Sequence, residues 1–229
     1  LLGRSIGIVG FGSIGQAVAV RARALGMRVF AWSRSLTDER AEDAGVERCA
    51  TLAELAATSD VVSVHLAVTP DTTGIIASDF FKAMDDGAIF INTSRGEIVD
   101  QDALAKAIET KGLKAALDVY ADEPSSGDAH YRATDFAASL AAATPHIGAS
   151  TDQAAEAIAA ETVRVIDSYI QTGKPVNAVN IRAKAEEDVS LVVRHYNRVG
   201  VLASVLDELK DARSEEHTSG LQSLLIISY

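Results

Sequence analysis

The sequence predicts an α/β protein built on a doubly wound parallel sheet. From Gly7 onward, short runs rich in β-branched residues alternate with longer stretches that have helical periodicity. Such an alternation is typical of a parallel sheet with crossover helices. The runs 61–66 and 88–92 are largely apolar on both faces, which indicates strands covered by helices on two sides.

The expected elements follow one another in chain order. Strands are expected at 7–10, 28–32, 61–66, 88–92 and 115–119, with helices between them. Three helix starts have local signals, because a side-chain oxygen there can accept hydrogen bonds from unpaired backbone N–H groups. Thr51 and Glu54 have capping-box spacing, Ser78 precedes an apolar helical run, and Asp100 precedes another helical stretch.

After a loop at 120–135, the sequence predicts a last strand near Ala142–Thr144 and a long helix from about Asp152 to Gln171. Residues 173–180 form an expected linker. A strand at 189–197 and a helix at 200–212 then begin a βα unit that cannot bury both of its faces alone. The expected organisation is therefore 1–150, 151–182, 183–212 and 213–229.

Both ends of the chain are expected to be truncated, since Leu1 is not an initiator residue and the chain opens directly on a strand. Residues 213–223 resemble the translation of a sequencing-adapter oligonucleotide. We therefore expect 213–229 to be a cloning or assembly artefact and exclude it from the fold prediction.

Composition excludes several classes of partner. The formal net charge of −11 argues against DNA or RNA, whose binding requires clustered Lys and Arg. The single cysteine, Cys49, cannot form an internal disulfide, and neither a signal peptide nor an apolar run of membrane-spanning length is found. We expect a cytoplasmic protein without a membrane partner. No spacing of His, Cys and carboxylates resembles a metal site.

A glycine-rich turn follows the first expected strand. Gly10, Gly12 and Gly15 supply Gly-x-Gly-x-x-Gly between that strand and the next helix, and Ser13 and Ile14 lie between the glycines. The glycines allow a tight turn and a close backbone approach to a pyrophosphate, which then faces the helix N-terminus. In this strand-turn-helix setting the pattern predicts dinucleotide binding.

The end of the second strand leaves the choice of cofactor open. An acidic residue there would bind the ribose 2′-hydroxyl of NAD, but the sequence has Ser33 and Arg34. Arg34 could pair with the 2′-phosphate of NADP, lie over the adenine or point into solvent. NAD is the expected cofactor and NADP remains an alternative.

Three further strands end in residues suited to hydride-transfer chemistry. Arg95 follows the strand at 88–92, Glu123 follows the strand at 115–119, and His146 follows the last strand. Ligands of open parallel sheets bind at this edge. The three residue types together match an alcohol–ketone hydride transfer: a cation for a carboxylate, an acid/base, and a carboxylate that stabilises the protonated base.

The motifs GIVGFGSIG, ATSDVVSVHLAVTPDTTGII, NTSRGEIVD, ALDVYADEP and TPHIGAST resemble, in order and spacing, the D-isomer-specific 2-hydroxyacid dehydrogenases across about residues 1–180. The resemblance implies an acid/base role for His146, pairing by Glu123, and substrate-carboxylate binding by Arg95. It places Asp118 near the nicotinamide, and it places three further residues along the cofactor: Ser13, Ile14 and Thr93. It also implies a separate substrate lobe upstream of Leu1 and a homodimer formed through the cofactor domain.

Residues 152–180, followed by the strand and helix after them, resemble the helix, linker and start of an ACT regulatory domain in the D-3-phosphoglycerate dehydrogenases of that family. This favours oxidation of 3-phosphoglycerate in serine biosynthesis. Two alternatives remain. One is another D-2-hydroxyacid or glyoxylate/hydroxypyruvate reductase, and the other is a dinucleotide-binding module without turnover.

Overall fold

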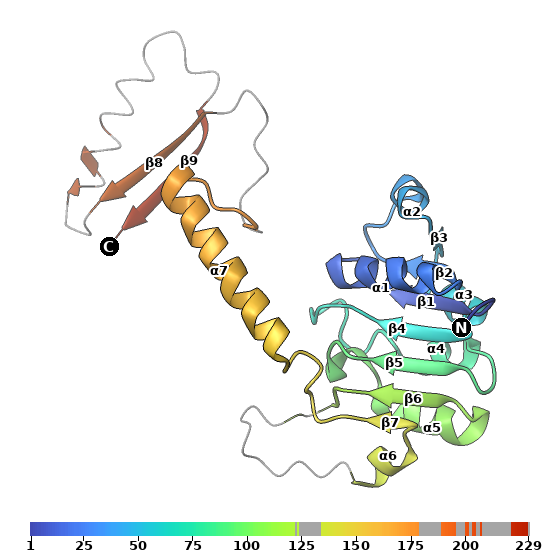
Figure 1. Ribbon diagram of the computed structural model, residues 1–229. Helices are drawn as coiled ribbons and strands as arrows, with labels where there is room; N and C mark the ends of the chain where they lie inside the picture. The colour runs from blue at the N-terminus through green and yellow to red at the C-terminus, as the bar shows by residue number, and fades with distance from the viewer. Residues whose placement is uncertain are drawn as a thin grey trace. The chain divides into compact units, whose positions relative to one another are not determined.

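The computed structural model describes residues 1–121, 123, 134–178, 189–195, 200, 201, 203, 204, 207 and 221–228. The chain divides into two compact units, Leu1–Thr151 and Asp152–Tyr229. Figure 1 shows the first unit as a sheet with helices packed on it. The turn at Asn197, Arg198 and Val199, together with most of the predicted helix at 200–212, lies outside the described residues.

The first unit is built on a parallel sheet. The described residues form its strands in the order β3-β2-β1-β4-β5-β6-β7, with every neighbouring pair parallel. The strands are β1 (Ser5–Val9), β2 (Arg28–Trp32), β3 (Glu47–Arg48), β4 (Val61–Val64), β5 (Ile89–Asn92), β6 (Lys114–Leu117) and β7 (Ala142–Ala143). The order reverses direction at β1, where β4 pairs on the side opposite to β2. The predicted doubly wound parallel sheet is confirmed.

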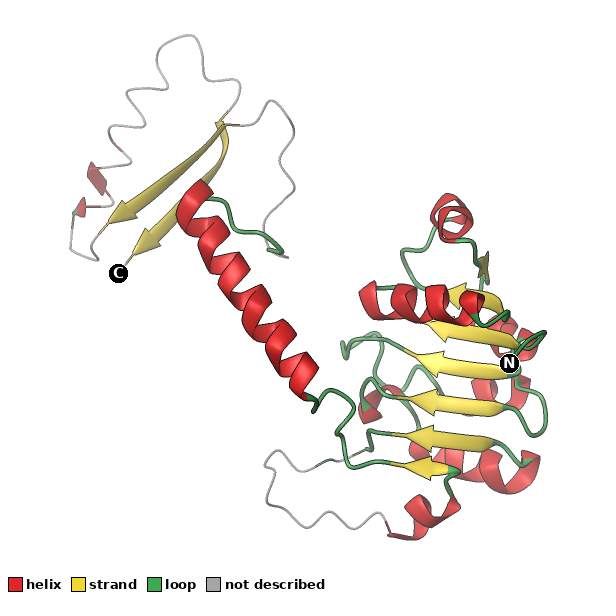
Figure 2. Cartoon of the chain, in the orientation of Figure 1, coloured by secondary structure: helices red, strands yellow, loops and turns green. Residues whose placement is uncertain are grey.

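Helices cover both faces of this sheet (Figure 2). The helices of the first unit are α1 (Ser13–Ala24), α2 (Asp38–Ala44), α3 (Leu52–Thr58), α4 (Ser78–Ala83), α5 (Gln101–Lys111) and α6 (Thr134–Ser139), with a 3-10 turn at Gly96–Ile98. One buried cluster joins α1 and α2 to β1 and β2. A second cluster, which includes Phe81, Phe90 and Leu104, packs α3, α4 and α5 on the other face.

Two of the three predicted helix caps are confirmed. The Thr51 side chain accepts from the Glu54 N–H (3.1 Å), and the Asp100 carboxylate accepts from the Ala103 N–H (2.9 Å). Ser78 is not a cap, so that prediction is wrong. Ser78 is the first helical residue of α4 and Ala77 is the cap position, because the chain enters the helix one residue earlier than the side-chain signal indicates.

The second unit contains α7 (Asp152–Thr172), β8 (Val189–His195) and β9 (Leu221–Ser228), and β8 pairs with β9 in parallel. The fold prediction excluded the segment that contains β9. Its apolar sequence LLII, with two β-branched isoleucines, nevertheless suits a strand. The predicted ACT-like unit and the artefactual origin of 213–229 remain predictions. Among the described helices, none combines the length and the hydrophobicity required to cross a bilayer.

Candidate active site

The glycine turn joins β1 to α1 in a conformation that requires glycine at two positions. Gly10 has φ +95°, and a Cβ there would collide with the backbone carbonyl of His65. A Cβ on Gly15 would collide with the carbonyl oxygen of Gly10. Gly12 differs from both, because a Cβ there would meet no described atom within 4 Å. The space above Gly12 therefore suits a pyrophosphate that approaches the backbone closely.

The first turn of α1 begins directly after Gly12. Gly12 is the N-cap residue and has no side-chain oxygen, so no side chain caps the helix within the described structure. Ser13 and Ile14 form the first turn and are exposed, with Ile14 67% accessible. An uncapped helix N-terminus with accessible N–H groups favours an anion. Ser13 and Ile14 thus lie where the sequence places the cofactor pyrophosphate.

Ser33 and Arg34 follow β2 at the same sheet edge. The Gly10 N–H donates to the carbonyl oxygen of Trp32 (2.8 Å), which fixes the end of β2 beside the glycine turn. Ser33 is half-buried and Arg34 is exposed. The Arg34 guanidinium pairs with the Asp71 carboxylate at 3.0 Å.

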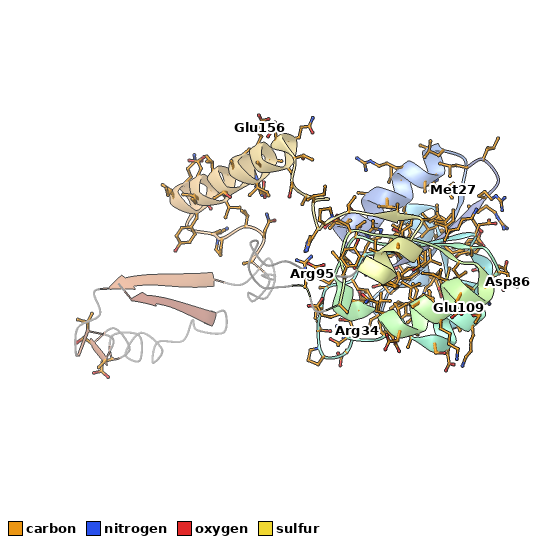
Figure 3. All side chains as sticks on the ribbon, turned by 90° about the horizontal axis from the view of Figure 1, so that it is seen from below. Met27, Arg34, Asp86, Arg95, Glu109 and Glu156 are labelled. Carbon is orange, nitrogen blue, oxygen red and sulfur yellow. The ribbon has the colours of Figure 1, made fainter. Side chains whose placement is uncertain are left out.

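Arg95 follows β5 at the sheet edge to which the strands point. Figure 3 shows it on the side of the first unit opposite to Asp86, which precedes β5. Its side chain is exposed and donates to the Ser94 carbonyl (2.7 Å), and within the described residues it has no carboxylate partner. Thr93, two residues earlier, is also exposed.

A buried asparagine shapes the turn that carries Arg95. The Asn92 amide donates to the Arg95 carbonyl (2.9 Å), and its oxygen accepts from the Ser94 N–H (3.0 Å) and hydroxyl (2.7 Å). Asn92 is 1% exposed. Sequence reasoning missed this residue. Its signal is an Asn at a strand end with Ser two residues later, which is the pattern of an Asx-turn.

Glu123 and His146 are brought together from two separate loops. The His146 Nδ1 lies 2.6 Å from the Glu123 Oε2, and both side chains are partly exposed. The other Glu123 oxygen accepts from the Tyr120 N–H at 2.6 Å. Because Nδ1 is engaged by the carboxylate, Nε2 of His146 is the nitrogen available to a substrate. This contact has the geometry expected of an acid/base and its carboxylate partner.

Asp118 fixes the loop that carries His146. Its Oδ1 accepts from the Thr144 hydroxyl (2.6 Å) and the Ile147 N–H (2.9 Å), and its Oδ2 accepts from the Gly148 N–H (2.9 Å). Burial opposes ionisation of this carboxyl, but these hydrogen bonds and His146 outweigh it and lower its pKa. His146 has φ +53°, a left-handed conformation that is uncommon for residues other than glycine.

Tyr120 is a second positioning residue that the sequence did not indicate. Its hydroxyl donates to the Thr144 carbonyl (3.1 Å), and the residue is 8% exposed. It therefore ties the loop after β6 to the end of β7.

His65 follows β4 at the same sheet edge. Its Nε2 lies within hydrogen-bond distance of the Ser63 hydroxyl (2.9 Å), and burial lowers the pKa of the imidazole.

A doubly wound sheet with a glycine turn before its first helix defines a dinucleotide-binding domain. Residues 1–148 match the family described as "D-isomer specific 2-hydroxyacid dehydrogenase, NAD binding domain". The chain belongs to this family, and residues 1–148 are its NAD-binding domain. The predicted family is thereby confirmed.

Individual relatives agree with this assignment. The chain is 34% identical over 238 residues to D-3-phosphoglycerate dehydrogenase 2 of Saccharomyces cerevisiae, covering 95% of this chain and 49% of that protein. It is 37% identical to the glyoxylate reductase of Thermococcus litoralis, covering 79% and 53%. A crystal structure of a glyoxylate reductase from Paecilomyes thermophila superposes with a TM-score of 0.67 at 32% identity, covering 78% and 53%. The chain thus spans about half the length of the curated relatives it matches.

Proposed function

We propose that the chain supplies the NAD-binding half of a D-3-phosphoglycerate dehydrogenase. The reaction would oxidise 3-phospho-D-glycerate to 3-phosphohydroxypyruvate, which enters serine synthesis. The observation that carries this choice is the extent of similarity. The yeast phosphoglycerate dehydrogenase aligns over 95% of the chain, so the alignment extends into residues beyond the domain match at 148.

Glyoxylate or hydroxypyruvate reduction is the second candidate. The Thermococcus glyoxylate reductase has the higher identity, 37%, although it covers only 79% of the chain. The residues proposed for catalysis recognise a 2-hydroxy acid group that both substrate classes share. A selection between the classes therefore depends on contacts to the rest of the substrate.

The site fits a dinucleotide, because the space above Gly12 and the first turn of α1 suit a pyrophosphate. NAD bound there would supply the hydride acceptor. We place Arg95 at the substrate carboxylate, since its guanidinium is exposed and can form a bidentate pair. We assign Asp118 to holding the His146 loop beside the nicotinamide end of the site.

His146 is proposed to move the substrate proton. In the oxidative direction its Nε2 accepts the proton of the C2 hydroxyl while the C2 hydrogen leaves as hydride. Glu123, at 2.6 Å from Nδ1, orients the ring and stabilises the imidazolium that forms. In the reductive direction the protonated ring donates to the carbonyl oxygen.

We propose NAD as the cofactor, with NADP as the alternative. The family match supports NAD. The Arg34 side chain, which stands where a carboxylate would bind the ribose hydroxyls, keeps NADP as an alternative.

The test compares substrates in a chain extended upstream to the full length of its relatives. Reduction of 3-phosphohydroxypyruvate, hydroxypyruvate and glyoxylate by NADH should be fastest, by kcat/KM, for the phosphorylated substrate. His146→Asn should lower turnover by about 10²–10⁴-fold. A preference for glyoxylate would select the second candidate. NADH binding without turnover of any 2-oxo acid would instead indicate a dinucleotide-binding module.

A further inference from the structure

Arg34 has an acidic partner that comes from a distant part of the chain. Its Nη1 lies 3.0 Å from the Oδ2 of Asp71, which is 37 residues later. Both side chains are exposed, at 81% and 75%. Figure 3 shows Arg34 on the same side of the first unit as Arg95, which is the edge where the strands end. A carboxylate from the loop after β4 therefore lies beside Arg34, two residues after β2.

Hydrogen bonds within that loop hold Asp71 in place. The Thr72 hydroxyl accepts from the Thr69 N–H (2.8 Å) and donates to the Ala67 carbonyl (2.6 Å). The Gly74 N–H donates to the Glu97 carbonyl (2.9 Å), which fixes the far end of the loop to the turn after Arg95. Asp71 thus projects from an ordered turn, and it is the long Arg34 side chain that reaches it.

We propose that Asp71 makes this site prefer NAD(H) over NADP(H). This inference rests on the proposed dinucleotide site. A 2′-phosphate carries close to two negative charges, whereas a 2′-hydroxyl carries none. A phosphate that approached Arg34 would compete with Asp71 for the guanidinium and would be repelled by the Asp71 carboxylate, only one hydrogen-bond length beyond it. NADH meets neither obstacle.

The size of the effect follows from charge separation. A 2′-phosphate sharing the guanidinium would lie roughly 5 Å from the Asp71 carboxylate. In a water-like medium, repulsion between the two charges of the phosphate and the single charge of Asp71 would raise the Kd for NADPH about tenfold. The pair itself is exposed and weak, so a chain without Asp71 should retain its fold. Because the effect is electrostatic and exposed, added salt should reduce it.

The experiment titrates NADH and NADPH into the 229-residue chain and its variants, following reduced-nicotinamide fluorescence. Asp71→Asn should tighten NADPH about tenfold and change NADH less than twofold. The control is Asp86→Asn, which makes the same change in net charge at the opposite sheet edge (Figure 3). It should leave both affinities unchanged.

A second variant isolates the Arg34 contribution. In an Arg34→Ala background no guanidinium draws the 2′-phosphate close to Asp71, so the repulsion is smaller and Asp71→Asn should improve NADPH binding less than threefold. A parent that binds NADH but whose NADPH affinity does not respond to Asp71→Asn, or responds equally to Asp86→Asn, would overturn this inference alone. A parent that binds neither dinucleotide would overturn the proposed function and this inference with it.

Discussion

Asp118→Asn tests whether one buried carboxylate holds the His146 loop. The amide has the same shape, and its oxygen can still accept from the Thr144 hydroxyl and the Ile147 N–H. Its NH₂ group must then face the Gly148 N–H, so a donor meets a donor where a 2.9 Å hydrogen bond existed. The lost charge-assisted bond costs about 1.5–3 kcal/mol, and weakening of the other two adds roughly 1 kcal/mol.

The loop should therefore open more easily by about 2.5–4 kcal/mol, which corresponds to about seventyfold to nearly a thousandfold faster exchange of its amides. Hydrogen exchange measured by NMR at Ile147 and Gly148 reads this directly. Asp86→Asn serves as the control, because that side chain is 83% exposed and lies elsewhere. Unchanged protection of both amides in Asp118→Asn would refute the reasoning.

The same variant has a defined pH dependence. Because the folded-state pKa of Asp118 is lowered, its stabilising contribution is complete above the unfolded pKa of about 3.9 and is lost as the pH falls through the folded value. The difference in exchange between parent and variant should be full at about pH 6 and shrink below about pH 4.

Three further changes test other parts of the chain. Gly12→Ala should leave the Tm within about 2 °C but weaken NADH binding at least about tenfold, since its methyl group would occupy the open space. Calorimetry measures the Tm and titration measures the binding. Gly15→Ala should instead impair both the Tm and NADH binding, because its methyl group would collide with the Gly10 carbonyl oxygen. The Ser5 N–H and hydroxyl and the Arg4 guanidinium lower the pKa of Asp60 to about 2. In urea unfolding, Asp60→Asn should therefore cost about 1 kcal/mol at pH 6, and this cost should fall away as the pH is lowered through about 2. The thiol of Cys49 is 3% exposed and burial raises its pKa, so it should react with a disulfide reagent only after unfolding; rapid reaction in the native state would contradict the buried position.

Periodicity and local caps predicted most of the first unit. The alternating strands, the glycine turn and the caps at Thr51 and Asp100 each depend on residues close together in sequence, so a local pattern was enough. The prediction that Ser78 caps α4 was wrong because a cap signal in the sequence locates a helix start only to within about a residue or two.

Asn92 escaped prediction although its contacts to Ser94 and Arg95 are local, but the other parts of the site that escaped prediction depend on contacts between distant segments. Arg34 and Asp71 are 37 residues apart, and Tyr120 reaches Thr144 across 24. Neither pairing leaves a periodic trace in the sequence. Glu123 and His146 are 23 residues apart, but both follow strands that end at the same sheet edge, so they could be brought together in advance, and the family resemblance implied their pairing.

The two outermost strands of the sheet affect the tendency of the chain to aggregate. An edge strand offers unpaired N–H and C=O groups on which another chain can add a strand and begin aggregation. Here both edges are two residues long, and one of them, β3, carries the charged side chains of Glu47 and Arg48. A shortened chain that ended before β7 would leave the four-residue strand β6 as its edge. Such a chain should precipitate at lower concentrations than the parent, which static light scattering would reveal.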